Sequence, residues 1–294
     1  MSSTPADGNN RQAGFDALLP HPLFIVSPPR SGSSMLLLAL AKAADAFTLR
    51  GESHALIETI PGLHPRDQGW TSNRLEAADA SSSIAQELSR RFYGSLRDRA
   101  GRPATGPAVM IEKTPKNSLR IPFLTAIYPD ARFLYLHRDP RETLSSMIEA
   151  WQSGQFVTYP RLPDWRGLPW SLLLTPGWRD LKGLRLPNIA AAQWRETVRT
   201  ILDDLSALPA ERVRAIRYGD LVADPQHVLS HACAAFGIEW DQELTSNLPL
   251  SPTVVSAPHA DKWRRHEAEI SDTWPVVAEQ AARVEVFVSA TSAS

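Results

Sequence analysis

Short, uninterrupted apolar runs alternate along this chain with longer stretches in which apolar residues recur every three or four positions. A continuous run of about four to eight residues is typical of a strand buried on both faces of a sheet, and the wider spacing is typical of a helix. The runs that predict strands lie at 22–27, 46–51, 107–114, 131–138 and 212–218. The stretches that predict helices lie at 35–44, 75–99, 118–128, 139–151, 188–205, 224–236 and 274–288.

This alternation predicts an α/β fold in which a central parallel sheet is flanked by helices on both faces, in three layers. In such sheets, ligands bind beyond the carboxyl ends of the strands. Four charged residues stand at or just after the ends of predicted strands: Arg30, Glu52, Lys113 and Arg138. We therefore expect these four side chains to gather at one edge of the sheet.

The chain divides into a polar lead-in and one long folded region. Residues 1–20 predict a disordered segment, and residues 21–294 predict one domain, a length that a single α/β domain reaches. Within this domain, residues 152–187 hold five prolines and three tryptophans without a clear period. We interpret this stretch as an insertion that forms a lid or a wall over a binding site.

Composition narrows the classes of partner. The formal net charge is −1, so the chain has no general attraction for nucleic acid or an anionic membrane, and any anion site must be local. The one cysteine, Cys233, excludes an intrachain disulfide and a cysteine metal cage, and its apolar neighbours favour a buried structural thiol.

The first residues lack the pattern of a signal peptide, and the longest apolar run, 35–41, is far shorter than the roughly 20 residues that span a bilayer. We expect a cytoplasmic protein without a membrane span. The histidines show no metal-ligand spacing, so no metal site is expected either.

The segment SPPRSGSS at 27–34 joins the first predicted strand to the first predicted helix. A tight turn at Gly32, followed directly by a helix, would direct several backbone N–H groups and the positive end of the helix dipole at one bound oxyanion. Arg30 would add a fixed positive charge. The hydroxyl donors of the loop are Ser31, Ser33 and Ser34. The alternative is an ordinary turn in which a serine only caps the helix.

A second candidate for anion binding lies in YLHRDPRETLSSMIEAW. Arg138 ends a strand, Asp139 and Pro140 are suited to begin a helix, and Ser146 lies eight residues after Arg138, about two helical turns on. Arginine offers a planar set of donors that suits phosphate, and the serine adds a neutral donor. By itself, this pair is also compatible with a solvent-facing arginine and a small residue at a helix contact.

Together, the two segments resemble the sulfotransferases that use 3′-phosphoadenosine 5′-phosphosulfate (PAPS). In that family, a loop of the type P-[K/R]-S-G-[T/S]-[T/S] holds the 5′-phosphosulfate, and a later strand-end arginine, followed eight residues on by serine, holds the 3′-phosphate. Residues 29–34 and the pair Arg138 and Ser146 match these patterns. The resemblance implies a P-loop-like, three-layer α/β/α fold and PAPS as sulfuryl donor, with no metal. It extends to the tyrosyl-protein, glycosaminoglycan and bacterial members.

Three further segments match that family. EKTPKN resembles the strand end whose lysine contacts the transferring sulfuryl group, which implies Lys113. RYGDLVADP resembles a segment with a tyrosine near the adenosine, which implies Tyr218. HADKWRRH resembles the C-terminal segment that closes over the cofactor phosphates, which implies Lys262. The matching segments run from about residue 22 to 150 and from 212 to 266.

Sulfuryl transfer needs a base for the proton of the acceptor hydroxyl and positive charge at the leaving phosphate oxygen. In the tyrosyl-protein and several bacterial members, a glutamate in a G-E segment after the second strand is the base, which implies Glu52. His54 is the alternative base, although the histidine of the small-molecule branch sits in a K-T-H segment that this chain lacks. Arg30 stands where that branch has lysine, and with Lys113 it would stabilise charge electrostatically. Glu52 could instead be a surface carboxylate paired with Arg50.

The sequence thus predicts a PAPS-dependent sulfotransferase that acts by in-line attack of an acceptor hydroxyl, with a carboxylate base. A P-loop kinase is the nearest alternative, but the chain lacks G-x-x-x-x-G-K-[S/T] and has cations where a magnesium ligand would be required. A nucleotide-binding protein without turnover is the other alternative. The serine hydrolase pattern G-x-S-x-G is also missing.

The acceptor stays open at this point, and so does the oligomeric state. A small molecule, a lipid or polyketide hydroxyl and a peptide tyrosine all remain, and residues 152–187, which should shape the acceptor pocket, match no segment of the family. The tryptophans of this stretch, Trp165, Trp170 and Trp178, favour an apolar or aromatic acceptor over a sugar polymer.

Overall fold

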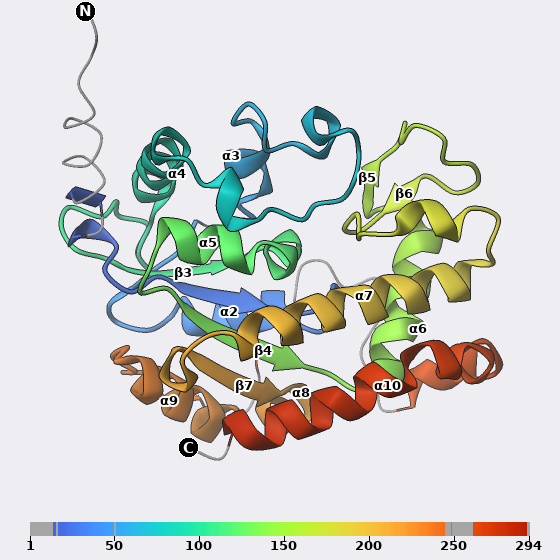
Figure 1. Ribbon diagram of the computed structural model, residues 1–294. Helices are drawn as coiled ribbons and strands as arrows, with labels where there is room; N and C mark the ends of the chain where they lie inside the picture. The colour runs from blue at the N-terminus through green and yellow to red at the C-terminus, as the bar shows by residue number, and fades with distance from the viewer. Residues whose placement is uncertain (1–13, 16, 50, 245–247, 249–260, 293–294) are drawn as a thin grey trace, which may run out of the picture.

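A five-stranded parallel sheet forms the centre of the computed structural model, which describes residues 14–15, 17–49, 51–244, 248 and 261–292 (Figure 1). The strands lie in the order β2-β3-β1-β4-β7, and every neighbouring pair is parallel. Their bounds are Ala46–Phe47 (β2), Val109–Lys113 (β3), Leu23–Val26 (β1), Arg132–His137 (β4) and Val213–Arg217 (β7). All five predicted strands and the parallel sheet are confirmed.

The second strand is shorter than the run at 46–51 predicts. Only Ala46 and Phe47 pair with β3, and Thr48 instead forms an antiparallel bridge with Arg97. The backbone N–H groups of Thr48 and Arg97 each donate to the other residue's carbonyl at 2.9 Å. Because these bonds draw the chain away from β3, the segment that carries Glu52 leaves the sheet early.

Each of the seven predicted helical stretches corresponds to a helix: α2 (Ser33–Leu40), α4 (Ser82–Ser95), α5 (Ile121–Ile127), α6 (Pro140–Ser153), α7 (Leu186–Ser206), α9 (Pro225–Phe236) and α10 (Glu267–Ser292). The sequence does not predict two further short helices, α3 (His54–Glu58) and α8 (Tyr218–Ala223). Within the stretch predicted as helical at 75–99, α4 begins only after Ser81, whose hydroxyl accepts the Ile84 backbone N–H at 3.4 Å, and it ends where Leu96 becomes extended. Asp139 caps α6 as expected, by accepting the Arg141 backbone N–H at 2.7 Å.

Two hydrophobic cores lie on opposite faces of the sheet, because successive strand residues point to opposite sides. Phe24, Val26, Phe133 and Tyr135 belong to a core that includes side chains of α4, α5, α6, α7 and α10. Leu23, Ile25, Leu134 and Leu136 belong to a second core with side chains of α2, α8 and α9. The molecule is therefore a three-layer α/β/α sandwich, as the sequence predicts.

The Pro- and Trp-rich stretch at 152–187 folds as an antiparallel hairpin, β5 (Val157–Tyr159) with β6 (Trp170–Ser171), followed by a short 3-10 helix at Trp178–Leu181. In Figure 1 the hairpin lies on the side toward which the strand arrows of the central sheet point. Trp165, Trp170 and Trp178 pack edge-to-face on one another, and Trp170 and Trp178 are fully buried. These tryptophans therefore pack against one another inside the insertion, and the role of this stretch as a lid or wall over a binding site stays a prediction.

The packed part of the chain starts before residue 21. Leu19 is buried in the larger core, and the Ala108 backbone N–H donates to the Leu18 carbonyl at 2.9 Å. The end of the expected lead-in is thus fixed to the domain, whereas residues 1–13 and 16 lie outside the described residues.

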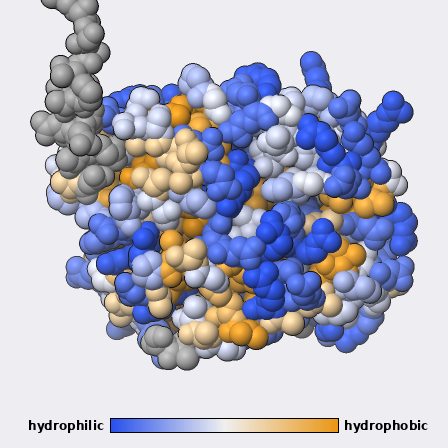
Figure 2. All heavy atoms as spheres, in the orientation of Figure 1, coloured by the Kyte–Doolittle hydropathy of each residue, from blue (hydrophilic) through white to orange (hydrophobic). Residues whose placement is uncertain are grey.

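Hydrophobic side chains on the surface occur as several patches separated by hydrophilic ones on the face drawn in Figure 2. The large hydrophobic side chains that are exposed lie far apart along the chain, at Leu38, Leu168, Leu184, Val222 and Val286. Among the described residues, no helix combines the length and the apolar character that a membrane crossing requires.

Candidate active site

A cavity of about 510 Å³ opens at the carboxyl ends of the strands, and it brings together nearly all residues that the sequence analysis singled out. Arg30, Glu52, Lys113 and Arg138, the four charged residues at strand ends, all line it. The other predicted site residues that line it are Gly32, Ser33, Ser34, His54, Ser146, Tyr218 and Lys262. The expectation that these side chains gather at one edge of the sheet is therefore met.

The loop before α2 turns at Gly32, which has a φ of 97°, a conformation that glycine adopts without steric cost. The ring of Tyr218 lies so close to this turn that a Cβ added to Gly32 would stand 2.6 Å from its Cε2 atom. Gly32 is the N-cap residue of α2 and no side-chain hydrogen bond caps the helix within the described residues, which does not favour the alternative of a turn built only for a serine cap. Helix N-termini leave backbone N–H groups without a partner inside the helix, and here they face a cavity lined by cations.

Arg30 and Arg138 connect the two predicted halves of the anion site. The Arg138 Nη1 atom donates to the Arg30 carbonyl at 3.3 Å, and its Nε donates to Glu142 at 2.7 Å. The Arg138 guanidinium stacks on the Tyr218 ring at 4.5 Å. Ser146 accepts a hydrogen bond from the Arg30 Nε at 3.3 Å. Burial and the charge of Arg138 lower the pKa of Arg30, which is the expected result of holding two cations close together.

Ser31 does not line the cavity. Its side chain is 1% exposed, and its Oγ has no hydrogen-bond partner among the described residues. Ser31 is thus not among the residues that line the cavity, and its role as a donor to a bound anion stays a prediction. The Oγ of Ser145, which does line the cavity, is likewise buried without a partner among the described residues.

Glu52 lies between a lysine and a histidine. Its Oε1 accepts a hydrogen bond from Lys113 Nζ at 2.6 Å, and its Oε2 lies 3.5 Å from His54 Nδ1. Burial alone would raise the pKa of Glu52, but the hydrogen bond with His54 and the charge of Lys113 outweigh it and lower that pKa to about 2. Glu52 is thus an ionised carboxylate at neutral pH. Arg50, the alternative partner, lies outside the described residues.

A buried hydrogen-bond network holds the residue between Glu52 and His54. The backbone N–H of Ser53 donates to Thr114 Oγ1 at 2.6 Å, and Asn117 donates to Ser53 Oγ at 3.1 Å. Thr114 and Asn117 in turn donate to the two oxygens of Glu112, at 2.6 and 2.8 Å. Because all these groups are fully buried, they fix the backbone that carries Glu52 and His54.

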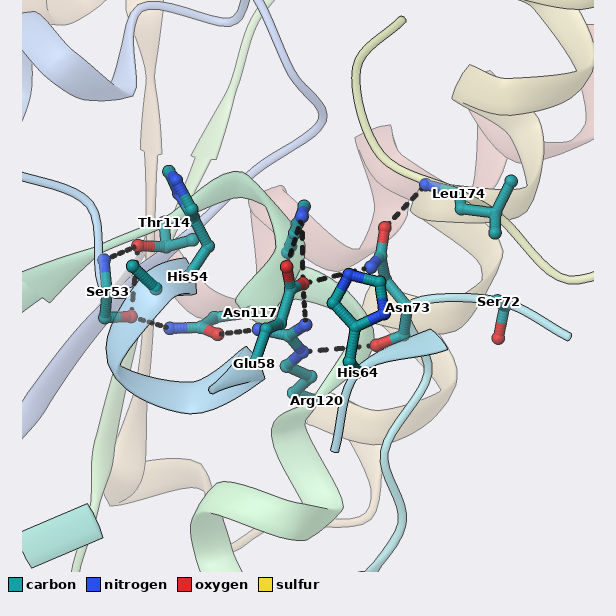
Figure 3. Close-up of polar contacts among 12 residues, drawn as sticks. Ser53, His54, Glu58, His64, Ser72, Asn73, Thr114, Asn117, Arg120 and Leu174 are labelled. Carbon is teal, nitrogen blue, oxygen red and sulfur yellow. Dashed lines mark hydrogen bonds and ion pairs between the residues drawn. The ribbon is translucent and has the colours of Figure 1, made fainter. Parts of the chain in front are cut away.

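A second ion pair lines the cavity, and the sequence analysis missed it. Lys116 Nζ lies 2.8 Å from both carboxylate oxygens of Glu58, and it also donates to the Tyr159 hydroxyl at 3.1 Å. The buried Arg120 donates to Glu58 Oε1 at 2.6 Å, and Figure 3 shows this contact beside Asn73 and His64. Although burial would raise the pKa of Glu58, the charges of Arg120 and Lys116 lower it.

Lys116 could have been noticed in the sequence, because it stands in the same EKTPKN segment as Lys113, three residues on. Glu58 carried no such signal, since it lies in no predicted element and a charged side chain is usually solvated. Tyr159 and its neighbours on β5 lay in the stretch that had no period. Their position at the cavity follows from the tertiary fold alone.

Lys262 approaches the cavity from the segment before α10. Its Nζ lies 2.7 Å from Glu149 of α6, and the adjacent Trp263 also lines the cavity. The guanidinium of Arg141 lies 5.5 Å from the centre of the Trp263 ring. These contacts place the predicted C-terminal cation at the same cavity as Arg30 and Arg138. Among the described residues, no group of three or more histidine, cysteine or acidic side chains could hold a metal ion.

Comparison with known proteins gives a consistent result. The model of the sulfotransferase family matches residues 22–168 and 170–242. Protein-tyrosine sulfotransferase A of Caenorhabditis elegans is 21% identical over 264 residues, which cover 87% of this chain and 58% of that protein. A putative protein-tyrosine sulfotransferase of Caenorhabditis briggsae is 24% identical over 127 residues, which cover 43% of this chain and 42% of that protein. The chain therefore spans about half the length of these curated relatives.

Among solved structures, sulfotransferase STF9 from Mycobacterium avium superposes with a TM-score of 0.51 at 16% identity, over 93% of this chain and 79% of that one. This similarity concerns the fold, which agrees with the sheet order and the three layers described above. The family model covers all five strands of the central sheet, the loop before α2 and the segment that carries Arg138 and Ser146. The chain belongs to the sulfotransferase family.

Proposed function

We propose that this chain transfers a sulfuryl group from PAPS to an acceptor hydroxyl, with Glu52 as the general base. The observation that carries the proposal is the meeting of Arg30, Lys113, Arg138 and Lys262 with the Glu52 carboxylate around one cavity. A donor with two separate phosphate groups requires several cations, and an acceptor hydroxyl requires a base beside them. The sulfotransferase names of the curated relatives support the same reaction class.

The residues present fit such a donor. The glycine at position 32 lets the ring of Tyr218 pack directly against the loop, and the hydroxyl of Ser145 at the cavity is still without a partner among the described residues. In the proposal, residues 30–34 hold the 5′-phosphosulfate. Arg138 and Ser146 hold the 3′-phosphate, and Tyr218 and Lys262 contact the adenosine and the phosphates.

PAPS supplies the sulfuryl group: the acceptor oxygen bonds to sulfur as the bond from sulfur to the phosphate oxygen breaks, which yields a sulfate ester and 3′-phosphoadenosine 5′-phosphate (PAP). Glu52 takes the proton of the acceptor hydroxyl. Arg30 and Lys113 stabilise the negative charge that develops on the leaving side. Arginine keeps its charge throughout, so Arg30 acts electrostatically and not as a proton donor.

Lys113 has two roles in this proposal. In the free protein its ammonium group is 2.6 Å from Glu52 and lowers the affinity of that carboxylate for a proton. When Lys113 shares its charge with the bound donor, Glu52 becomes the stronger base that proton transfer requires. His54, whose side chain is 47% exposed, orients the other oxygen of Glu52. We assign the base to Glu52 because its oxygens contact both Lys113 and His54.

Calorimetry with PAP, ATP and ADP tests the donor assignment. We expect PAP to bind tightly and ATP and ADP to bind much more weakly, because only PAP carries the 3′-phosphate that Arg138 would contact. Arg138→Ala should weaken PAP binding by about ten- to a hundredfold, the usual cost of losing a hydrogen bond to a charged group. Equal binding of ATP and PAP would favour a kinase instead.

Turnover of Glu52→Gln tests the base. We expect the rate to fall by about a hundredfold or more while PAP affinity stays close to that of the unmodified protein, because the amide keeps the size of the side chain but cannot take the proton. His54→Gln serves as the matched control and should cost much less. A Glu52→Gln protein with normal turnover, or one that loses PAP binding in parallel, would contradict the assignment.

A further inference from the structure

Part of the cavity is lined by the β5–β6 hairpin, to which the proposed donor site assigns no role. The lining residues of the hairpin are Gln155, Phe156, Val157, Thr158, Tyr159, Leu172 and Leu173. The guanidinium of Arg30 lies 4.4 Å from the centre of the Phe156 ring. The hairpin therefore adjoins the loop that is proposed to hold the phosphosulfate, in the cavity that also contains Glu52. An acceptor hydroxyl must stand between these two groups, so the rest of the acceptor meets the hairpin.

Leu172 has a backbone conformation that is unfavourable for leucine. Its φ is 64°, in the left-handed region that side chains with a Cβ rarely adopt. Its side chain is 9% exposed and lines the cavity. Of the other described non-glycine residues with positive φ, only Arg30 also lines the cavity. Strained backbone of this kind persists where the surrounding structure fixes it, and it is frequent at binding sites.

The surroundings fix the hairpin at several points. The Leu172 backbone N–H donates to the Phe156 carbonyl at 2.9 Å, which joins the two residues across the hairpin. The buried Gln193 of α7 donates to the carbonyls of Ser171 and Leu173 at 3.1 and 2.6 Å. Directly after Leu173, the backbone N–H of Leu174 donates to Asn73 Oδ1 at 2.6 Å, as Figure 3 shows. The wall is therefore already formed in the free protein.

From this geometry we infer that Phe156 and Leu172 form a rigid apolar wall that binds the body of the acceptor, and that the acceptor is an apolar or aromatic hydroxyl compound. The inference rests on the proposed function and specifies its acceptor. A sugar would place polar hydroxyls against the side chains of Phe156, Val157 and Leu172, which themselves carry no donor or acceptor to pair with them. An aromatic acceptor instead gains binding free energy when its ring is buried against these side chains. Because the wall is already formed, little conformational entropy is lost in ordering the hairpin on binding.

Direct binding measures the wall without depending on turnover. The probes are phenol, 4-phenylphenol, which adds one apolar ring, N-acetyltyrosinamide as the peptide-tyrosine analogue, and methyl glucoside as the sugar. Each is titrated calorimetrically into the full chain with and without PAP. We expect 4-phenylphenol to bind at least about tenfold more tightly than phenol, because an apolar pocket discriminates to this degree for small apolar additions. N-acetyltyrosinamide should bind like phenol, and methyl glucoside should bind most weakly.

Variants at Leu172 test whether the hairpin causes the tighter binding of 4-phenylphenol than of phenol. Leu172→Ala and Leu172→Gly should each weaken 4-phenylphenol binding by about tenfold while leaving phenol and PAP affinities unchanged. Leu172→Gly should keep more thermal stability than Leu173→Gly, because glycine relieves the strained φ at 172 whereas φ at 173 is not positive. Leu168→Gly is the control for a leucine-to-glycine change elsewhere in the insertion, because Leu168 is exposed and does not line the cavity; it should leave 4-phenylphenol binding unchanged.

Two outcomes overturn the inference: unchanged 4-phenylphenol affinity in both Leu172 variants, or tighter binding of the glucoside than of either phenol. Failure of the proposed donor site has a different signature. If PAP does not bind but 4-phenylphenol binding still depends on Leu172, the apolar wall stands and sulfuryl transfer from PAPS fails. If PAP binds as expected and the phenols do not bind, the donor site stands and the apolar wall fails.

Discussion

The low pKa of Glu52 means that its carboxylate is ionised at neutral pH and, in the free protein, has little affinity for a proton. Lys113 and His54 each contact one of its oxygens, and together they outweigh the effect of burial and lower the pKa to about 2. A carboxylate with so low a pKa holds its proton only in strong acid. The pH dependence of the reaction therefore distinguishes Glu52 from a histidine base, because an ordinary imidazole changes its charge between about pH 6 and 7.

We predict that kcat/KM has no acidic limb from the base between about pH 4.5 and 8, as follows from a pKa of about 2 in the free protein. A general base acts only in its ionised form. Because a lowered pKa keeps Glu52 ionised at lower pH, kcat/KM should fall only as the pH approaches that pKa. The measurement is kcat/KM against pH with the unmodified protein and His54→Gln. An acidic limb in this range that disappears in His54→Gln would instead identify the histidine as base.

At the scale of elements, the sheet could be predicted well because its strands are short and continuously apolar. The segments around residues 22–27, 107–114, 131–138 and 212–218 each became a strand of the central sheet. Parallel strands then bring their carboxyl ends to one edge, so Arg30, Lys113 and Arg138 could be grouped without any knowledge of side-chain contacts. That grouping is the part of the candidate site that follows from the strand pattern alone.

The acceptor side could not be predicted in the same way. Phe156 and Leu172 lie outside every periodic segment, and they meet across a hairpin whose strands have three and two residues. The tryptophans attracted attention as large aromatic residues, yet they pack against one another inside the insertion. Only the tertiary fold determines which of these side chains face the cavity. Likewise, Ser31 shares the loop of Ser33 and Ser34 but is buried and does not line the cavity.

The turn into α3 yields a prediction about positioning. Thr114 accepts the Ser53 backbone N–H and donates to Glu112, so its hydroxyl links the sheet to the segment that carries Glu52. Thr114→Val keeps the shape and removes the hydroxyl. We expect kcat to fall by about ten- to a hundredfold, because a misplaced catalytic group costs rate to this degree, while PAP affinity is unchanged.

Thr114→Ser, which keeps the hydroxyl, is the matched control and should retain most of the activity. Steady-state kinetics with calorimetric titration of PAP separate the two effects. If Thr114→Val loses PAP affinity together with kcat, the hydroxyl supports the fold of the whole site and does not position Glu52 in particular.

At the scale of the whole molecule, one buried network joins segments that are far apart in the sequence. It runs from Thr114 through Ser53 and Asn117 to Arg120, Glu58 and Asn73, as Figure 3 shows. From Asn73 it reaches the hairpin at Leu174 and Tyr159. The segment of the proposed base and the wall of the proposed acceptor site are therefore held by the same set of hydrogen bonds. Within this network, the Glu58 carboxylate binds both buried cations, Lys116 and Arg120.

Glu58→Gln should consequently destabilise the protein by about 3–5 kcal/mol, because it leaves Lys116 and Arg120 buried without a negative charge. Urea unfolding measures the loss. Glu87→Gln is the matched control: its carboxylate pairs with Arg90 and Arg91 on the surface of α4, where loss of an ion pair costs about 1 kcal/mol or less.

The pH dependence of stability gives a second test of Glu58. Its pKa is lowered in the folded protein, so its contribution is fully present above its ordinary value of 4.5 and is lost as pH falls further toward the folded-state pKa. The difference in unfolding free energy between the unmodified protein and Glu58→Gln should therefore be largest near neutral pH and shrink below pH 4.5. A difference that stays constant across this range, or a cost no larger than that of Glu87→Gln, would mean that the buried cations do not depend on Glu58 for their stability.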